Sequence, residues 1–122
     1  IQMKKLPRLI SQRKINAQIL TDLLKNSDAI LPEQRKNETV NWYLYTVALK
    51  NRDKAMKKLN ASGIGARIYY SPPVHKTPYY KTKLCLSNTE WAASHVLSLP
   101  VHPKVRKTDL AMMKKILLDS RN

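Results

Sequence analysis

The run VNWYLYTVAL, residues 40–49, constrains the fold of this chain more than any other stretch. It is dominated by β-branched, aromatic and aliphatic residues and contains no Gly or Pro, which predicts a central strand buried on both faces. Such a strand needs covering elements, and the segments on either side of it repeat apolar residues at helical spacing. With 122 residues, the chain is predicted to be one α+β domain of helices packed on a small sheet.

Periodicity and breakers predict the remaining elements and leave the sheet antiparallel or mixed, with about three strands. In chain order these are a helix over 2–25, a loop over 26–38, the strand over 40–49, a helix over 52–62, a strand over 64–70, an ordered loop through 80, a helix from 87 to about 95, a strand over 96–100 and a last helix after 107. Pro7 either bends the first helix or marks its start.

Cap residues support these boundaries. Asn51 is predicted to be an N-cap, Gly63 a C′ residue, Ser87 with Glu90 a capping box, and Thr108 the cap of the last helix. The inward helical positions share a spacing of three, four or seven residues: Leu6, Ile10, Ala17, Leu20, Leu24, Ala55, Met56, Leu59, Leu110, Met113, Ile116 and Leu117. Along 64–70, Ile64, Ala66, Ile68 and Tyr70 alternate on one face.

The net charge is +15, from 23 Lys and Arg against 8 Asp and Glu. This excess favours an anionic partner: nucleic acid, a phosphorylated small molecule or an acidic protein surface. A soluble protein coated with lysine, or part of a larger protein with an acidic remainder, explains it equally well. The single Cys85 fits a reducing compartment, and no apolar run is long enough to span a membrane, so we expect a cytoplasmic protein with no membrane partner.

No catalytic centre and no metal site are predicted from the residues alone. Two glycines exclude a glycine-rich phosphate loop, and the carboxylates form no acid/base pair. His75, His95 and His102 lack zinc-ligand spacing.

The most unusual stretch is YYSPPVHKTPYY, residues 69–80, which fits a base-stacking platform, a substrate-gripping loop or a stiff connector. The alternative function is a basic module that binds nucleic acid or an acidic protein partner. In the nucleic-acid case, Tyr69, Tyr70, Tyr79 and Tyr80 stack bases. Its phosphate contacts would come from basic residues distributed along the chain: Arg8, Arg13, Lys14, Lys57, Lys58, Lys104, Arg106, Lys107, Lys114 and Lys115. No nucleic-acid-binding signature occurs, and the prolines place the tyrosines in a loop rather than on a sheet face.

Four stretches together resemble the C-terminal part of the DegT/StrS family of pyridoxal-phosphate-dependent sugar aminotransferases. They are the helix IQMKKLPRLISQRKINAQILTDLL, the strand NWYLYTVAL, the run NRDKAMKKLNASGIGARIYYSPPVHKTPYY with its Y-x-P-x-x-H-x-x-P-x-Y pattern, and VLSLPVHPKV. The resemblance covers nearly the whole chain in the family's order. It implies the fold of the small C-terminal domain of fold-type-I aminotransferases.

The resemblance also implies a division of labour within a longer enzyme. A preceding N-terminal domain would bind pyridoxal phosphate and supply both the Schiff-base lysine and the carboxylate facing the pyridine nitrogen. The enzyme would transfer an amino group to a keto-sugar carried on a nucleotide, in a cleft at a homodimer interface. This chain, which begins within a helical pattern at Ile1 as an excised piece would, is then expected to bind no cofactor and to be inactive alone.

By the family pattern, Tyr70 and His75 lie at the substrate side of the cleft, His75 bonds a phosphate or sugar oxygen, Tyr80 closes the loop, and Tyr43 faces the cleft. The alternatives are that Tyr80 only packs the loop onto the domain, that His75 is solvated, and that Tyr43 packs across strands. The family often has His where this chain has Asn41 and Tyr43, and Pro at Ser71, which leaves the sugar specificity open.

Overall fold

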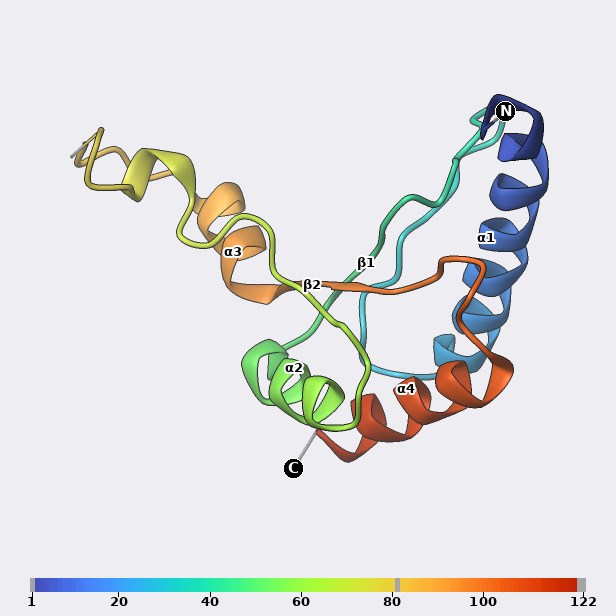
Figure 1. The fold of residues 1–122 in the computed structure, drawn as a ribbon. Coiled ribbons are helices and arrows are strands. Elements are labelled where there is room, and N and C mark those ends of the chain that lie inside the picture. The colour runs from blue at the N-terminus through green and yellow to red at the C-terminus, as the bar shows by residue number, and fades with distance from the viewer. Residues whose placement is uncertain (1, 81, 121–122) are drawn as a thin grey trace.

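The computed structural model describes residues 2–80 and 82–120 and confirms the α+β prediction (Figure 1). In chain order the elements are α1 (Gln2–Leu24), β1 (Tyr45–Ala48), α2 (Arg52–Ala61), the 3₁₀ turn η1 (Val74–Lys76), α3 (Ser87–His95), β2 (Val96–Leu99) and α4 (Lys107–Asp119). Pro7 lies inside α1, so it does not mark the helix start. Within the described residues, no helix is both long and apolar enough to cross a membrane.

The sheet has two strands, β1 and β2, which pair antiparallel with Tyr45 opposite Leu99 and Ala48 opposite Val96. One isolated β-bridge lies along the outer edge of each strand. Ile30 exchanges backbone hydrogen bonds with Ala48 beside β1, and Arg67 does the same with Ser98 beside β2. Both strands therefore have a neighbour on each side for at least one residue, which is why their residues are largely buried.

The predicted third strand over 64–70 is wrong, because only Arg67 pairs with the sheet. The Ala66 N–H, which a regular strand would offer to the ladder or to solvent, bonds to the Ile64 carbonyl at 2.7 Å and to Asn60 Oδ1 at 3.0 Å. This tight local turn prevents a continuous register. The predicted alternation is still visible in burial, since Ile64 and Ala66 are buried, but Tyr70 is exposed.

The predicted strand over 40–49 is also too long at its start. The side chain of Asn41 accepts a hydrogen bond from the Tyr43 N–H at 3.0 Å, a local turn that competes with strand pairing. Trp42 then has a positive φ of 51°, a conformation that no residue adopts within a strand. Regular pairing therefore begins only at Tyr45.

The core lies between the sheet and the helices α1, α2 and α4, whereas residues 70–80 and 82–95 project from this body as an arm that carries η1 and α3 (Figure 1). Most predicted core positions are buried or partly buried. Leu6 is an error, because it is exposed and the buried residues of α1 run only from Asn16 to Leu24. Only this second half of α1 lies in the core.

Two polar side chains join segments across the core. Asn16 on α1 donates from Nδ2 to the carbonyls of Val101 and His102, at 3.3 and 3.1 Å, and so holds the loop that follows β2. Arg52, at the start of α2, is buried and donates from NH1 to the carbonyl of Ala93 at 2.9 Å, near the end of α3. The Arg52 Nε lies 2.8 Å from Asp53 Oδ1, which balances the buried charge.

Two predicted caps are shifted along the chain. The N-cap of α3 is Leu86 rather than Ser87, although Glu90 does accept a hydrogen bond from the Leu86 N–H at 3.0 Å. The N-cap of α4 is Arg106 rather than Thr108, because the carboxylate of Asp109 reaches back to the Arg106 N–H at 2.9 Å. Asn51 is at the N-cap of α2 as predicted, but its side chain makes no capping bond and instead donates to the Ser120 carbonyl.

The C-terminal end of α2 confirms the prediction for Gly63, which has a φ of 78°. Its N–H bonds to the Asn60 carbonyl, and the next N–H, of Ile64, bonds to the Leu59 carbonyl, each at 3.0 Å. These two bonds form a Schellman motif, and both Ile64 and Leu59 belong to the core. The chain reverses here because glycine adopts a left-handed conformation without a Cβ penalty.

We predict that Gly63→Ala lowers the free energy of unfolding by about 1–2 kcal/mol, because an L-residue is strained at a positive φ. Chemical denaturation measures this change. The matched control is Gly65→Ala, since Gly65 has no positive φ and an added Cβ would meet no atom within 4 Å. Equal losses for the two variants would contradict the assignment of strain to Gly63.

Candidate substrate-binding site

Three of the four predicted binding residues, Tyr70, His75 and Tyr80, line one cavity of about 700 Å³ on the arm. The rest of its lining is mostly apolar and comes from the loop around η1 and from α3, and we call this cavity the tyrosine groove. The Tyr70 and Tyr80 side chains are 75% and 58% exposed, so both are open to a ligand. Tyr80 also packs edge-on against Tyr79, with ring centroids 5.1 Å apart.

His75 is held firmly at the wall of the groove rather than solvated, since its side chain is only 10% exposed. Its Nε2 lies 3.0 Å from Glu90 Oε1, and the same oxygen accepts from Lys76 Nζ at 3.3 Å and from the Leu86 N–H at 3.0 Å. Glu90 on α3 therefore links η1 to α3 within the arm. We call this set of contacts, made by the Glu90 carboxylate with His75, Lys76 and the Leu86 N–H, the Glu90 cluster.

The cluster limits what His75 offers to a ligand. With Nε2–H donated to Glu90, the neutral ring leaves Nδ1 as an acceptor. An acceptor suits a sugar hydroxyl, whereas a bond to a phosphate oxygen requires the protonated ring. Of the two contacts expected from the sequence, the sugar oxygen is thus the one that matches the neutral side chain.

Tyr43 does not join the other three residues. It precedes β1, is 70% exposed, and lines a different cavity of about 600 Å³, so the cross-strand packing alternative is wrong. The guanidinium of Arg13 lies 5.6 Å from the centre of its ring. Arg13 NH1 also donates to the carbonyls of Trp42 and Tyr43, at 3.3 and 3.2 Å, and thereby holds this turn against α1.

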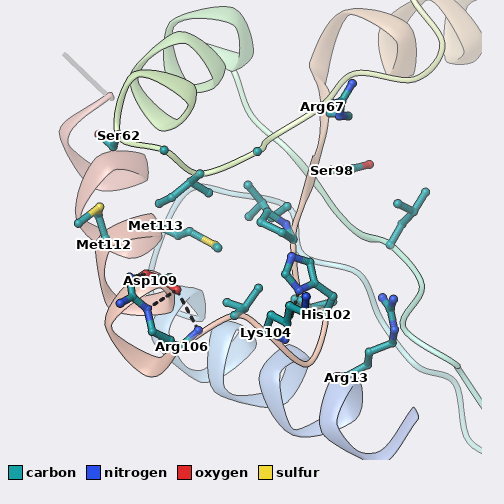
Figure 2. Close-up of a pocket in the computed structure, with 18 of the residues that line it drawn as sticks. Arg13, Ser62, Arg67, Ser98, His102, Lys104, Arg106, Asp109, Met112 and Met113 are labelled. Carbon is teal, nitrogen blue, oxygen red and sulfur yellow. Dashed lines mark hydrogen bonds and ion pairs between the residues drawn. The ribbon is translucent and has the colours of Figure 1, made fainter. Parts of the chain in front are cut away.

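This second cavity, the basic cavity, lies between α1, α4 and the segments that flank β2 (Figure 2). Its side chains include Arg13, Arg67, Lys104 and Arg106, with His102 beside Lys104. Asp109 also lines it and is bound by Arg106 through two contacts, at 2.9 and 3.2 Å. The Arg106 guanidinium lowers the pKa of Asp109, so this carboxylate is ionised and already paired.

Sequence reasoning included Arg13, Lys104 and Arg106 in a broad set of basic residues but did not single out a cavity. Arg67 and His102 were missed as parts of it. No local pattern indicates them, because Arg67 comes from the segment beside β2 and the others from α1 and the loop before α4. Glu90 was assigned only to capping, and its contact with His75 spans 15 positions of sequence.

Comparison with known proteins identifies the family to which this chain belongs. A model of the DegT/DnrJ/EryC1/StrS aminotransferase family matches residues 1–117. The solved structure of DesV from S. venezuelae, in complex with a ketimine intermediate, superposes with a TM-score of 0.88 at 24% identity, over 100% of this chain and 34% of that one. At this identity the superposition shows a shared fold.

Two curated relatives agree with the family match. An uncharacterized protein of Methanocaldococcus jannaschii is 26% identical over 98% of this chain and 35% of its own length. The dTDP-3-amino-3,4,6-trideoxy-alpha-D-glucose transaminase of Streptomyces venezuelae is 36% identical over 54% of this chain and 18% of its own length. The chain belongs to the DegT/DnrJ/EryC1/StrS aminotransferase family and spans about a third, or less, of the length of these relatives.

The family is pyridoxal-phosphate-dependent, and the linings of the tyrosine groove and the basic cavity can be compared with what this cofactor needs. It requires a lysine for the Schiff base and a carboxylate free to face the pyridine nitrogen. The tyrosine groove has no lysine in its lining, and the basic cavity has only Lys104 and the already paired Asp109. Likewise, residues 2–80 and 82–120 contain no group of three or more His, Cys, Asp or Glu side chains that could hold a metal ion.

We predict that the Glu90 carboxyl titrates with a pKa of about 2, below its ordinary 4.5, chiefly because of the hydrogen bond from His75 and next because of the Leu86 N–H. Carboxyl-carbon NMR during a pH titration measures it. Because His75 is the largest cause, His75→Ala should raise this pKa toward 4.5 more than Lys76→Ala does. The reverse order would contradict the described geometry.

The same shift has a consequence for stability. A carboxyl group with a lowered pKa in the folded state stabilises the fold above its unfolded pKa of about 4.5, and this contribution is lost as the pH falls toward 2. The stability difference between the natural chain and Glu90→Gln should therefore shrink between pH 4.5 and 2. The exposed Glu33→Gln is the control.

Proposed function

We propose that this chain is the C-terminal part of a pyridoxal-phosphate-dependent aminotransferase that acts on a nucleotide-linked keto-sugar. The observation that carries the proposal is the family match over residues 1–117. Residues outside this chain then bind the cofactor. The relative from Streptomyces venezuelae is named for a dTDP-linked amino sugar, which supports a nucleotide-sugar substrate.

In this proposal the tyrosine groove forms one wall of the substrate site. Tyrosines provide rigid apolar faces with a hydroxyl at the tip, which suits the stacking and hydrogen bonding of a sugar. Tyr70 and Tyr80 contact the sugar, and His75, fixed by Glu90, accepts a hydroxyl. The exposed apolar side chains along the arm, among them Trp91 and Leu84, make it a dimer surface in the full-length enzyme. The lone Cys85 fits a cytoplasmic enzyme.

A first prediction concerns the cofactor. After incubation with pyridoxal phosphate and desalting, the isolated chain should show no absorbance band from a bound cofactor, because a transient adduct on an exposed lysine hydrolyses. A stoichiometric, stable aldimine would contradict the proposal.

A second prediction concerns the groove. An isotopically labelled chain titrated with dTDP-glucose should show chemical-shift changes at Tyr70, His75 and Tyr80. Tyr70→Ala and His75→Ala should each weaken this binding about fivefold, the equivalent of ~1 kcal/mol of lost contact. Tyr79→Ala is the control, because Tyr79 is 87% exposed and lies outside the groove lining.

The control variant also separates this proposal from nucleic acid binding. A base-stacking protein would use the most exposed ring, so Tyr79→Ala would weaken its binding to single-stranded DNA. Such binding would also fall steeply with salt, as counterion release requires. Tight, salt-dependent binding that is lost with Tyr79→Ala would support the nucleic-acid function, and a groove-specific loss supports the aminotransferase.

A further inference from the structure

We propose that the exposed face of α2 is an interaction surface for the phosphate backbone of a nucleic-acid duplex. This face consists of Lys54, Lys57 and Lys58, and we call it the lysine face. None of the three lysines lines the tyrosine groove or the basic cavity, so the surface is separate from the proposed function. The placement, the charge balance and the chemistry of these side chains each support the assignment.

The spacing of the three lysines gathers them on one side of α2. Positions three and four residues apart are neighbours on a helix surface, so Lys54 lies next to both Lys57 and Lys58. All three side chains are exposed, whereas Ala55 and Leu59 on the opposite side of the helix are buried in the core. Three ammonium groups therefore share one outward surface.

Carboxylates of the described chain do not neutralise this surface. Within residues 2–80 and 82–120, none of the three lysines forms an ion pair. Asp53 is the one acidic residue of α2, and its Oδ1 lies 2.8 Å from Arg52 Nε. Helix α2 packs beside α4 (Figure 1), where Lys58 Nζ donates at 3.1 Å to the carbonyl, not the carboxylate, of Asp119. The lysine face thus keeps its full positive charge.

This arrangement of charge is unfavourable for the helix itself. Like charges three and four residues apart on a helix repel each other, as Lys54 does with Lys57 and with Lys58. Lys54 also lies in the first turn of α2, where the positive end of the helix dipole disfavours a cation. Glutamine has a helix propensity close to that of lysine, so helix stability does not require lysine here. A bound polyanion would remove the repulsion.

The composition of the face favours a phosphate backbone over other anionic surfaces. Binding to a membrane interface requires large apolar side chains next to the cations, and residues 45–68 include no exposed large hydrophobic side chain. Protein–protein interfaces are depleted in lysine, which argues against an acidic protein. Lysine binds phosphate as a point charge, and the release of counterions from nucleic acid favours such contacts.

The lack of aromatic side chains on these helices favours a duplex over a single strand. Proteins that bind single strands stack the bases on aromatic rings, and neither α2 nor α4 contains Tyr, Trp or Phe. Lysines on one helix face contact phosphates without reading base edges. We therefore expect binding to a duplex with no sequence preference.

The test is the fluorescence anisotropy of a short labelled DNA duplex, titrated with the 122-residue chain at a series of salt concentrations. A triple variant carries Lys54→Gln, Lys57→Gln and Lys58→Gln. It should bind the duplex more weakly, and the slope of log affinity against log salt should become shallower by about 3, because each phosphate contact contributes roughly one unit. Circular dichroism verifies that the variant remains helical.

The matched control removes the same charge from exposed residues of another helix. It carries Lys4→Gln, Lys5→Gln and Arg8→Gln, all on the first half of α1. The salt slope of this control should stay within about one unit of that of the natural chain. A slope change equal to that of the α2 variant would mean general attraction to a cationic protein and would overturn the proposal.

Two further ligands separate the duplex from the alternatives. A single strand that binds more tightly than the duplex, and whose binding is lost with Tyr79→Ala, would overturn the proposal in favour of base stacking. Polyglutamate that binds more tightly than a duplex of the same charge would overturn it in favour of an acidic protein partner. Binding of dTDP-glucose at the tyrosine groove should be the same in the α2 variant and the natural chain, so the lysine face and the proposed function fail or stand separately.

Discussion

The placement of the arm depends on the buried guanidinium of Arg52. It binds the carbonyl of Ala93 in the last turn of α3 and lies 3.4 Å from that of Val96 at the start of β2, so one side chain fixes the angle at which helix passes into strand. Carbonyls at a helix C-terminus lack intrahelical donors and carry partial negative charge, which a guanidinium satisfies well. Without it, these buried acceptors and Asp53 would lose their partner. The tyrosine groove, whose lining includes Ala93 and Val96, would lose its fixed wall.

The tyrosine groove and the basic cavity differ in the chemistry of the side chains that line them. The tyrosine groove is apolar with one anchored imidazole, whereas the basic cavity concentrates guanidinium and ammonium groups. Four of the 23 Lys and Arg residues, Arg13, Arg67, Lys104 and Arg106, line the basic cavity.

The elements were predictable from the sequence where the signal is local. Helical periodicity located both ends of α1, α2 and α3 and the start of α4 to within two residues, and Gly63 marked the end of α2. The prediction of a third strand was wrong because the Ala66 N–H donates to Asn60 Oδ1 and to the Ile64 carbonyl instead of to a neighbouring strand. Strand propensity does not indicate these local hydrogen bonds. Tyr43 lines a different cavity from Tyr70, His75 and Tyr80, and this separation could not be predicted from the sequence. A left-handed Trp42 carries no sequence signal, since such positions usually have Gly or Asn.

Tyr69 and Tyr70 are consecutive in the chain, yet Tyr69 lines the basic cavity and Tyr70 the tyrosine groove. This short segment, which is a bend, therefore contributes to the walls of both cavities. A change in the conformation of this bend would therefore alter the linings of both cavities at once.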